Sequence, residues 1–566
     1  MSIGSPTSPR SAISAILHTI EPQLEASEVI DAWRTARKQL DEAIHSYLWK
    51  TTVLGFLPPG TIEPSSPEPE SSSVWDEMNS ETQALSFRMN ILEKGRIMIK
   101  QIRNRSPYLA PINKLPPEVL FKVFSLSTLK PKTEWSGYFE HGTTLYSITG
   151  LTNLSYVCTQ WRTFIVNQPS FWSHIIFRPD RLYRSGTIQW RLLQLSLDRS
   201  LGNPLCITMP SNVLSLGLER TRRGFKYLKP FTSKIKRLII TSYYHYQNAL
   251  LWFLDNLQTT ACSFENLTIT GLDQARSTSN LADESNPSLS DPKYEACLLS
   301  ISSLHLNQAS FPWDSPIYQN LVSLSLQKLP VGQQTGPATN HIIAILSASP
   351  QLESLSLGTK VIPDGDTQSL ASQVQLSALK RLNLRKAGVE GMLQLLPRLS
   401  VLSEALTLEF DMHLDISYEA AVMDFLGRVN VTRLVMNGDM IPNDAESEQI
   451  TTSIEGICAS LPNLEYLKFI GRPNSNSQPS LAAAISRVSL TRYEPLCPKL
   501  RVFSVVNESL SKGDLHNIAL AHPFLQQLHL VNCTVLSHDL LPWVLDEWLT
   551  EAIGHAVLTI NFHTRR

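Results

Sequence analysis

Cationic side chains recur at equivalent positions of three short apolar segments in the second half of the chain. The cations and the polar residues among them are Arg381, Asn383, Arg385, Arg433, Tyr466 and Lys468. A guanidinium group can bind a carboxylate or a phosphate through two parallel hydrogen bonds, and Arg and Tyr are frequent anchors of protein interfaces. The pattern therefore predicts a surface that binds an acidic or phosphorylated protein segment, unless nearby acids such as Glu409 and Glu465 neutralise it.

Signatures of catalysis are absent from the sequence. It contains no G-x-S-x-G nucleophile turn, no G-x-x-x-x-G-K-[ST] phosphate loop, no H-E-x-x-H zinc helix and no G-x-G-x-x-G dinucleotide turn. The residues nearest to a metal site are His522, His529, Cys533 and His538. Zinc ligands must converge on one tetrahedron, whereas His529 and Cys533 occupy different positions of a repeat. We therefore expect no enzymatic activity, no cofactor and no metal.

The elements that must position the cations are copies of one six-residue pattern, Leu-x-x-Leu-x-Leu. Clear copies lie at residues 235–240, 301–306, 321–326, 352–357, 379–384, 431–436, 464–469, 500–505 and 525–530. This is the strand of a leucine-rich repeat. Helical patterns between copies, at 341–348, 420–429, 451–460 and 515–521, complete the repeats. Such units bury a common core only when they stack, which predicts a curved solenoid.

The repeat register assigns a direction to each side chain. The leucines point into the core, and the residues that alternate with them line the concave face. The predicted cations lie on that face. The alternative to a binding role is that they are merely solvated strand residues. A second alternative for the fold is a purely helical, HEAT-like solenoid.

The composition describes a folded chain without a strong electrostatic preference. Among 566 residues the formal net charge is -1, charged residues make up 17% and hydrophobic residues 42%. A near-neutral chain argues against strong binding to nucleic acid or to an anionic membrane. The seven cysteines are scattered without a Cys-x-x-Cys pair, which favours reduced, mostly buried thiols. With no secretory signal and no apolar run long enough to cross a bilayer, we expect a cytoplasmic or nuclear protein.

The segment at residues 111–176 combines several helix signals. Pro116 and Pro117 suit the first turn of a helix, where a proline loses no hydrogen bond, and Glu118 favours the positive helix end. Apolar residues recur at helical spacing in Val119, Leu120, Val123 and Phe124. A second helix is expected to carry Leu151, Leu154, Val157, Cys158 and Trp161. So small a bundle cannot bury all these apolar residues, so some should face a partner.

This segment resembles an F-box. The resemblance rests on Leu115-Pro116-Pro117-Glu118, the apolar helix after it, Val157-Cys158-Thr159-Gln160-Trp161-Arg162 and Pro169-Ser170-Phe171-Trp172. It covers about an eighth of the chain. The family usually joins its first two helices by a short turn, whereas here residues 128–150 fill the gap. Enlarged gaps of this kind are similar to those of the F-box families of mushroom-forming fungi.

The resemblance implies a function. An F-box followed by a repeat solenoid looks like the substrate-recognition subunit of an SCF-type E3 ubiquitin ligase, which docks on a Skp-family linker protein and, through it, on cullin and RING subunits. The solenoid would hold a protein substrate. By resemblance, the docking surface or its support consists of Leu115, Pro116, Glu118, Val119, Leu120, Val123, Leu154, Val157, Trp161 and Trp172. The alternative is a protein-binding scaffold outside any ligase.

The fold class expected is therefore α/β, with N-terminal α-helices and a helical F-box bundle followed by an irregular leucine-rich-repeat-like α/β solenoid. We expect disorder at 1–10, a helix at 11–56, a flexible linker at 57–73, a helix at 74–108, the F-box-like domain at 109–178 with its insertion at 128–150, and the solenoid at 180–566. The linker assignment follows from its proline, serine and glutamate content, which offers no packing face.

Overall fold

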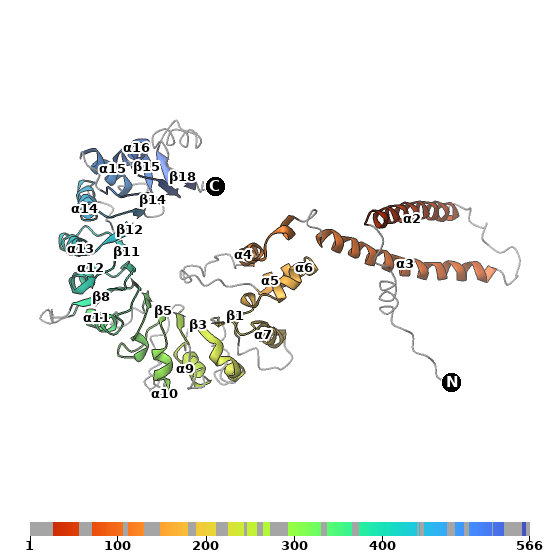
Figure 1. Cartoon of the computed structure of the whole chain (residues 1–566), viewed down its shortest axis with the longest axis horizontal. Coiled ribbons are helices and arrows are strands. Elements are labelled where there is room, and N and C mark those ends of the chain that lie inside the picture. The colour runs from red at the N-terminus through yellow and green to blue at the C-terminus, as the bar shows by residue number, and fades with distance from the viewer. Residues whose placement is uncertain are drawn as a thin grey trace. The chain divides into compact units, whose positions relative to one another are not determined.

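The computed structural model describes most of the chain (Figure 1). The described residues are 26–55, 71–105, 111–128, 148–178, 188–210, 225–242, 246–256, 264–271, 292–329, 337–364, 373–438, 441, 447–471, 481–491, 497–522, 524–536 and 557–561. The chain divides into two compact units, Met1–Arg103 and Asn104–Arg566. The predicted linker at 57–73 and insertion at 128–150 lie largely outside the described residues, and the domain boundaries stay predictions.

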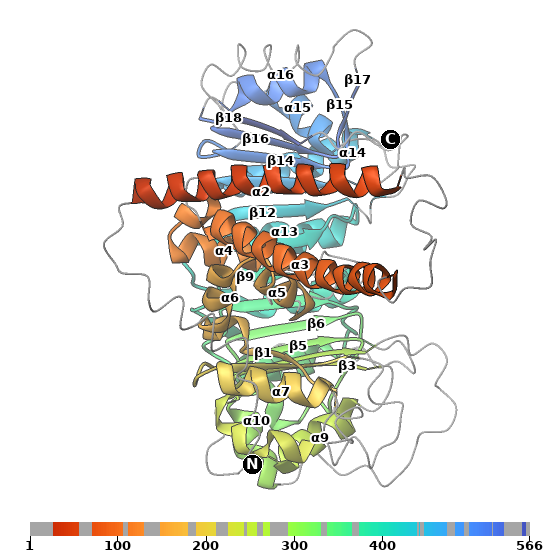
Figure 2. The same cartoon turned by 90° about the vertical axis from the view of Figure 1, so that its right-hand side faces the viewer.

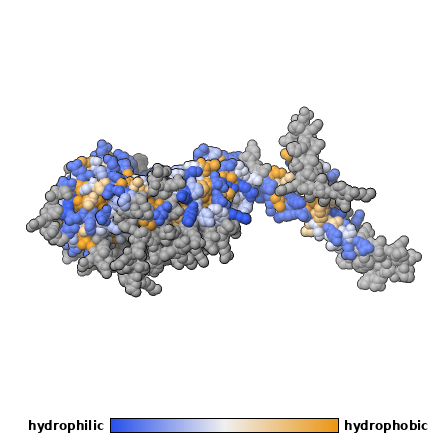
Figure 3. Space-filling view, turned by 90° about the horizontal axis from the view of Figure 1, so that it is seen from below, coloured by the Kyte–Doolittle hydropathy of each residue, from blue (hydrophilic) through white to orange (hydrophobic). Residues whose placement is uncertain are grey.

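The first unit consists of two long helices, α2 (Ala26–Gly55) and α3 (Ser71–Arg105). Tyr47 of α2 donates a hydrogen bond of 3.0 Å to the Glu81 carboxylate of α3, and Arg88 forms an ion pair with the same carboxylate. Large apolar side chains such as Trp49 and Phe87 are nevertheless exposed. Figure 3 shows hydrophobic side chains, in orange, on the surface of this unit.

The second unit begins with a small helical bundle. It contains α4 (Pro117–Thr128), α5 (Ile148–Ser155), α6 (Thr159–Val166) and the short helix η3 (Pro169–Phe171). The expectation that one helix carries both Leu151 and Trp161 is wrong, because α5 ends at Ser155 and a separate helix, α6, begins at Thr159. Cys158 has an extended backbone, and its Sγ accepts a hydrogen bond from the Trp161 amide at 3.4 Å, which caps α6.

Aromatic side chains fill the core of the bundle. The Phe124 ring lies 4.7 Å from Trp161 and 5.7 Å from Phe164, centroid to centroid. Trp172 is buried and donates a hydrogen bond of 2.8 Å from Nε1 to the Ile165 carbonyl. These contacts join α4, α6 and the segment after η3, and the buried Leu151 of α5 completes the same core.

The rest of the second unit is a solenoid built on one 14-stranded sheet in which every neighbouring pair is parallel (Figure 2). Its strands in order are β1 (His174–Ile176), β2 (Leu205–Met209), β3 (Ile235–Ser242), β4 (Asn266–Gly271), β5 (Ser303–Asn307), β6 (Ser323–Gln327), β7 (Ser354–Gly358), β9 (Arg381–Asn383), β11 (Leu406–Asp411), β12 (Val431–Asn437), β13 (Tyr466–Ile470), β14 (Val502–Val506), β16 (Gln527–Val531) and β18 (Val557–Asn561). Two small parallel pairs accompany it, β8 (Val374–Leu376) with β10 (Leu399–Val401) and β15 (Ser509–Ser511) with β17 (Thr534–Leu536).

Helices connect the strands and cover one side of the sheet. They are α7 (Ile188–Arg199), α9 (Tyr246–Asn256), α10 (Pro292–Leu299), α11 (Thr339–Ser347), α12 (Val389–Leu395), α13 (Ile416–Arg428), α14 (Ser447–Ala459), α15 (Leu481–Thr491) and α16 (Lys512–Ala521). Figure 1 shows them on the outer side of a curved array whose inner side is formed by the strands. Between the two layers, leucines of the repeats and rings such as Phe425 and Phe503 are fully buried, forming one continuous core.

The bundle and the solenoid are joined at β1. This strand directly follows the bundle and pairs with β2. The Arg199 guanidinium at the end of α7 lies over the Trp172 ring, 4.6 Å from its centroid, and Leu195 of α7 packs against the bundle core. The helical bundle therefore packs against α7 at the first end of the sheet.

The structure confirms the predicted fold class. All nine predicted copies of the repeat form strands of the large sheet, and the parallel sheet excludes the purely helical solenoid. Strands β4 and β11 were not predicted from the pattern, because Phe264 and Ala405 stand where it expects a leucine. No helix of the described segments is long and apolar enough to cross a membrane.

The redox state of the described cysteines differs from the expectation at one residue. Cys158, Cys206, Cys458, Cys497 and Cys533 are free thiols, whereas Cys297 of α10 is disulfide-bonded. The expectation that all cysteines are reduced is therefore wrong at Cys297, because sequence spacing does not reveal which thiols the fold brings together.

Candidate protein-binding sites

Strand register sorts the concave face of the sheet into rows. One row runs through His305, Ser325, Ser356, Asn383 and Glu409, which are aligned partners on β5, β6, β7, β9 and β11. The residues before and after each of them on the strand point the other way, into the core. The rows therefore present a polar surface over these five strands.

Small side chains hollow this surface. On β6 and β7 the outward positions include Ser323, Ser325, Ser354, Ser356 and Gly358. Larger residues stand on both sides, on β5 and on β9 to β11. The result is a pocket of about 540 Å³ between β5 and β11, which we call the β5–β11 pocket. Its volume falls within the range of ligand-binding clefts.

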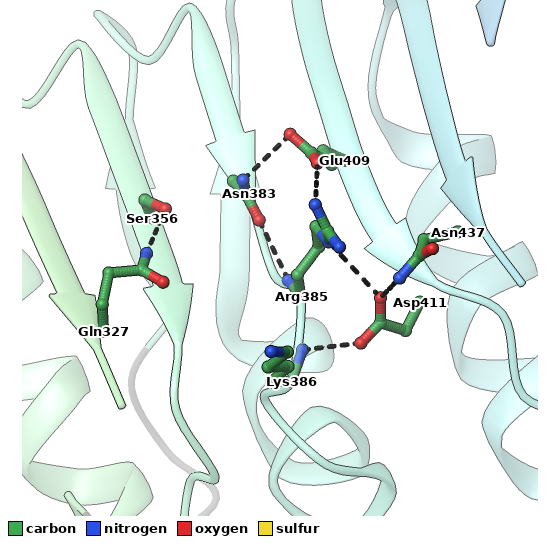
Figure 4. A network of polar contacts seen from close by, with 8 residues as sticks. All are labelled: Gln327, Ser356, Asn383, Arg385, Lys386, Glu409, Asp411 and Asn437. Atoms are coloured by element: carbon green, nitrogen blue, oxygen red, sulfur yellow. Dashed lines mark hydrogen bonds and ion pairs between the residues drawn. The ribbon is translucent and has the colours of Figure 1, made fainter. Parts of the chain in front are cut away.

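A polar network forms one wall of the pocket (Figure 4). Arg385 Nη1 lies 3.2 Å from Glu409 Oε1, and Arg385 Nε lies 3.7 Å from Asp411 Oδ1. Asn383 donates a hydrogen bond of 2.9 Å to the other oxygen of Glu409. Asp411, which is buried, also accepts bonds from the Lys386 amide at 2.8 Å and from Asn437 Nδ2 at 2.7 Å. Two carboxylates thus hold Arg385 in place and balance its charge.

The floor of the pocket is neutral and polar. Gln327 Nε2 donates a hydrogen bond of 2.9 Å to Ser356 Oγ (Figure 4). A Cβ at position 358 would collide with the Gln327 amide, so Gly358 lets this side chain lie across β7. Beside Gln327 in the same row lies Asn307, which is 4% exposed. Its Oδ1 has no hydrogen-bond partner among the described residues.

The six residues predicted to bind substrate divide into two groups. Arg381, Asn383 and Arg385 line the β5–β11 pocket, whereas Arg433, Tyr466 and Lys468 lie on β12 and β13, outside its lining. The Arg433 guanidinium stacks over the Tyr466 ring, 4.2 Å from its centroid.

Arg385 and Arg381 differ in how they are held. Arg385 lies beyond the end of β9 rather than on an outward strand position, and it is committed to Glu409 and Asp411. Arg381 is exposed, and its side chain makes no ion pair or hydrogen bond with another described residue. Of the predicted cations that line the pocket, Arg381 is the one open to a ligand.

Several lining residues were not among the predicted site residues. They are His305, Asn307, Ser325, Gln327, Lys328, Ser354, Ser356, Gly358, Lys386 and Thr407. A sequence signal for them exists, since SLSLQ at 323–327 and SLSLG at 354–358 are the copies with the smallest outward residues. Consecutive copies with small outward residues predict a depression.

The bundle offers a second candidate site. Of the residues that resemblance assigns to docking, Leu120 and Trp172 are buried, and Leu115, Leu154 and Trp161 are half-buried against the core. The exposed ones are Pro116, Glu118, Val119, Val123 and Val157, which we call the docking face. Val119 and Val123 are one helical turn apart on α4, and so share one side of that helix.

Hydrogen bonds bring Val157 next to the start of α4. Asn113, just before α4, accepts a hydrogen bond of 3.0 Å from Trp161 Nε1 and donates one of 2.5 Å to the Asn104 carbonyl. Asn104 in turn donates to the Val157 carbonyl at 3.4 Å. The turn between α5 and α6 is thereby tied to the segment that precedes α4.

Titratable groups with altered pKa values lie outside both sites. Burial raises the pKa of the Cys206 thiol to about 11 and lowers the pKa of His522 to about 4. At neutral pH Cys206 is therefore a protonated thiol, which is a poor nucleophile, and His522 is neutral. In the part of the chain that the structure describes, no group of three or more His, Cys, Asp or Glu residues is arranged to hold a metal ion.

Comparisons with known proteins assign one part of the chain. Residues 112–178 match the family described as F-box-like, and no curated protein matches the chain significantly. The chain is also similar to a solved structure, the crystal structure of a TLR13–ssRNA13 complex, with 11% sequence identity and a TM-score of 0.29. That match covers 58% of this chain and 46% of the TLR13 chain, so the chain spans less than half the length of that protein. Residues 112–178 therefore form an F-box-like domain, which precedes a parallel-sheet solenoid.

Proposed function

We propose that the chain is the substrate-recognition subunit of an SCF-type E3 ubiquitin ligase. An F-box-like domain and a repeat solenoid point to an adaptor or scaffold rather than to a catalytic enzyme. In this proposal the F-box-like domain docks on a Skp-family linker, which connects it to cullin and RING subunits. The solenoid holds a protein substrate near the ubiquitin carrier, which raises its effective concentration there.

The observation that carries the proposal is the exposed apolar surface of a bundle whose core is already filled. Phe124, Ile165 and Phe171 are almost completely buried, so the fold of the bundle does not require Val119 and Val157 to be apolar. Val119 is 42% exposed and Val157 47% exposed. Val123, on the same side of α4, is exposed as well. A patch of several apolar residues left in water beside a complete core is typical of a protein-binding surface.

The test is docking of the full-length chain on a Skp-family linker. Val119→Asp with Val157→Asp should weaken binding by roughly 30-fold or more, because loss of an apolar anchor commonly costs about 2 kcal/mol or more. The control is Ile416→Asp, which alters an even more exposed apolar residue, 81% exposed, at the start of α13 in the solenoid. Ile416→Asp should leave docking unchanged.

The result also separates a ligase subunit from an unrelated scaffold. Copurification of the linker together with a cullin supports the ligase subunit. A double variant that binds the linker as tightly as the unaltered chain would show that the docking face is wrongly assigned. An unaltered chain that binds no Skp-family linker would overturn the proposed function itself.

A further inference from the structure

The β5–β11 pocket contains a buried polar atom that the protein leaves unsatisfied. Asn307 is 4% exposed and lines the pocket, yet its Oδ1 has no hydrogen-bond partner in the described part of the chain. A buried acceptor without a partner is costly to a fold. A group that enters the pocket and donates a hydrogen bond to Asn307 would remove that cost.

The pocket surrounds this acceptor with two kinds of surface. Its floor is the neutral ladder of Ser325, Gln327 and Ser356, which offers hydroxyl and amide groups. Its rim is cationic, because four cationic side chains and a single carboxylate line the pocket. The carboxylate is Glu409, which is already bound to Arg385 and Asn383. The charge of Arg381 therefore remains for a ligand.

Two of the cations are held in an unusual backbone conformation. Lys328 and Lys386 follow β6 and β9 with positive φ angles of 43° and 62°. After β14 and β16 the equivalent conformation is adopted by Asn507 and Asn532, a residue type that tolerates it better. Lysine is thus present after two of the strands that form the pocket, where asparagine would be less strained. After β5 the equivalent conformation is adopted by Gln308, with a φ of 54°.

We propose that the β5–β11 pocket binds an extended peptide segment of the substrate through one acidic group and a backbone amide several residues away along the segment. The separation is needed because Asn307 on β5 and Arg381 on β9 are three strands apart, about 14 Å at ~4.8 Å per strand. The acidic group meets Arg381 at the rim, and a backbone N–H donates to Asn307 Oδ1 at the floor. This proposal rests on the proposed function, since it identifies the substrate class of the same concave face. The acidic group is a carboxylate or a phosphate, supplied by a chain end or by a side chain.

Arg385 has a different role in this site. Its two carboxylate partners fix it against the wall, and Asp411 is itself held by Asn437 and by the Lys386 amide. Arg385 is therefore a positioning residue that keeps Asn383 and Glu409 in place. Arg381 and Asn307 are the residues that contact the peptide.

The test measures binding of four sets of fluorescent, N-acetylated hexapeptides to the full-length chain by anisotropy. One set has a free C-terminal carboxylate, and the other three are amidated and contain an internal glutamate, an internal phosphoserine or no charge. We expect at least one anionic set to bind about tenfold or more tighter than the neutral set, and the set that binds identifies the source of the acidic group.

Variants separate contact residues from the rest of the face. Arg381→Gln should weaken the preferred anionic set about tenfold and leave the neutral set unchanged. Asn307→Leu should weaken both sets, because the amide loses its acceptor. Because Asn307→Leu alters a buried residue, Arg381→Gln, which alters an exposed residue, is the decisive variant. Arg433→Gln, outside the pocket, is the matched control and should change nothing.

The outcomes distinguish this proposal from the proposed function. Equal binding of neutral and anionic sets, or an equal loss with Arg433→Gln and Arg381→Gln, overturns the pocket assignment. Linker docking is measured on the same preparation. Loss of peptide selectivity with intact docking overturns only the pocket assignment, whereas selective peptide binding without docking supports the pocket and overturns only the ligase role.

Discussion

The helical bundle and the concave face of the solenoid both leave side chains exposed, but of opposite character. The docking face of the bundle presents valines beside a complete aromatic core. The β5–β11 pocket presents serines, amides and cations above a leucine core. Apolar surfaces bind by excluding water, whereas charged and polar surfaces bind partners with complementary charges and hydrogen-bonding groups. The two regions should therefore respond differently to core mutation and to salt.

The largest expected effect distinguishes the core of the bundle from its surface. Phe124→Ala removes a ring that is 1% exposed and contacts Trp161 and Phe164. We expect a loss of about 3–5 kcal/mol in the stability of the bundle, the usual cost of a buried aromatic. Hydrogen exchange of α4 to α6 in the full chain measures it.

Two controls limit the interpretation of that change. Val119→Ala, on the exposed side of the same helix, should alter exchange of α4 by less than about 0.5 kcal/mol. Exchange of β6 and β7 should be the same in both variants, because these strands do not contact the bundle core. Unchanged protection of α4 in Phe124→Ala would show that the bundle core does not depend on this ring.

Much of the solenoid could be predicted from sequence, because a single physical requirement repeats. Each strand must point leucines inward, so the alternation is visible in the letters of nine of the 14 strands. The pattern is incomplete in the other strands, for example in β4 and β11, where Phe264 and Ala405 replace the first leucine. The bundle was less predictable. Helical spacing continues from Leu151 to Trp161, but Cys158 caps a new helix through its own sulfur, and spacing alone does not reveal a cap.

The pocket could be predicted only in part. Arg381 was found because its outward position follows from the register. The roles of Arg385 and Asn307 depend on contacts between strands that are distant in sequence. Arg385 reaches Asp411, 26 positions later, and Asn307 Oδ1 has no partner among the described residues although its aligned neighbours, Thr270 and Gln327, are both polar. Such pairings arise from stacking of repeats and have no local signal.

A salt titration should distinguish the two binding regions, because peptide binding and linker docking should depend differently on NaCl concentration. The expected effect is smaller than that of Phe124→Ala. Raising the NaCl concentration from about 0.05 M to about 0.5 M shortens the screening length severalfold. Binding of the preferred anionic peptide set should weaken about tenfold, because Arg381 is exposed to solvent. Docking on the Skp-family linker should change by less than about twofold, because valines dominate its surface. Equal salt dependence of the two equilibria would contradict the division into an apolar and a polar site.

The smallest effect concerns the part of the concave face outside the pocket. Arg433 lies over the Tyr466 ring at 4.2 Å, and an exposed cation–π contact is worth about 0.5–1 kcal/mol. A double-mutant cycle with Arg433→Gln and Tyr466→Leu should give a coupling energy of that size, measured by hydrogen exchange of β12 and β13. Peptide affinity should remain the same throughout the cycle, because neither side chain lines the pocket. A coupling energy near zero combined with weaker peptide binding would instead make Arg433 a ligand contact, and would extend the polar site across β12.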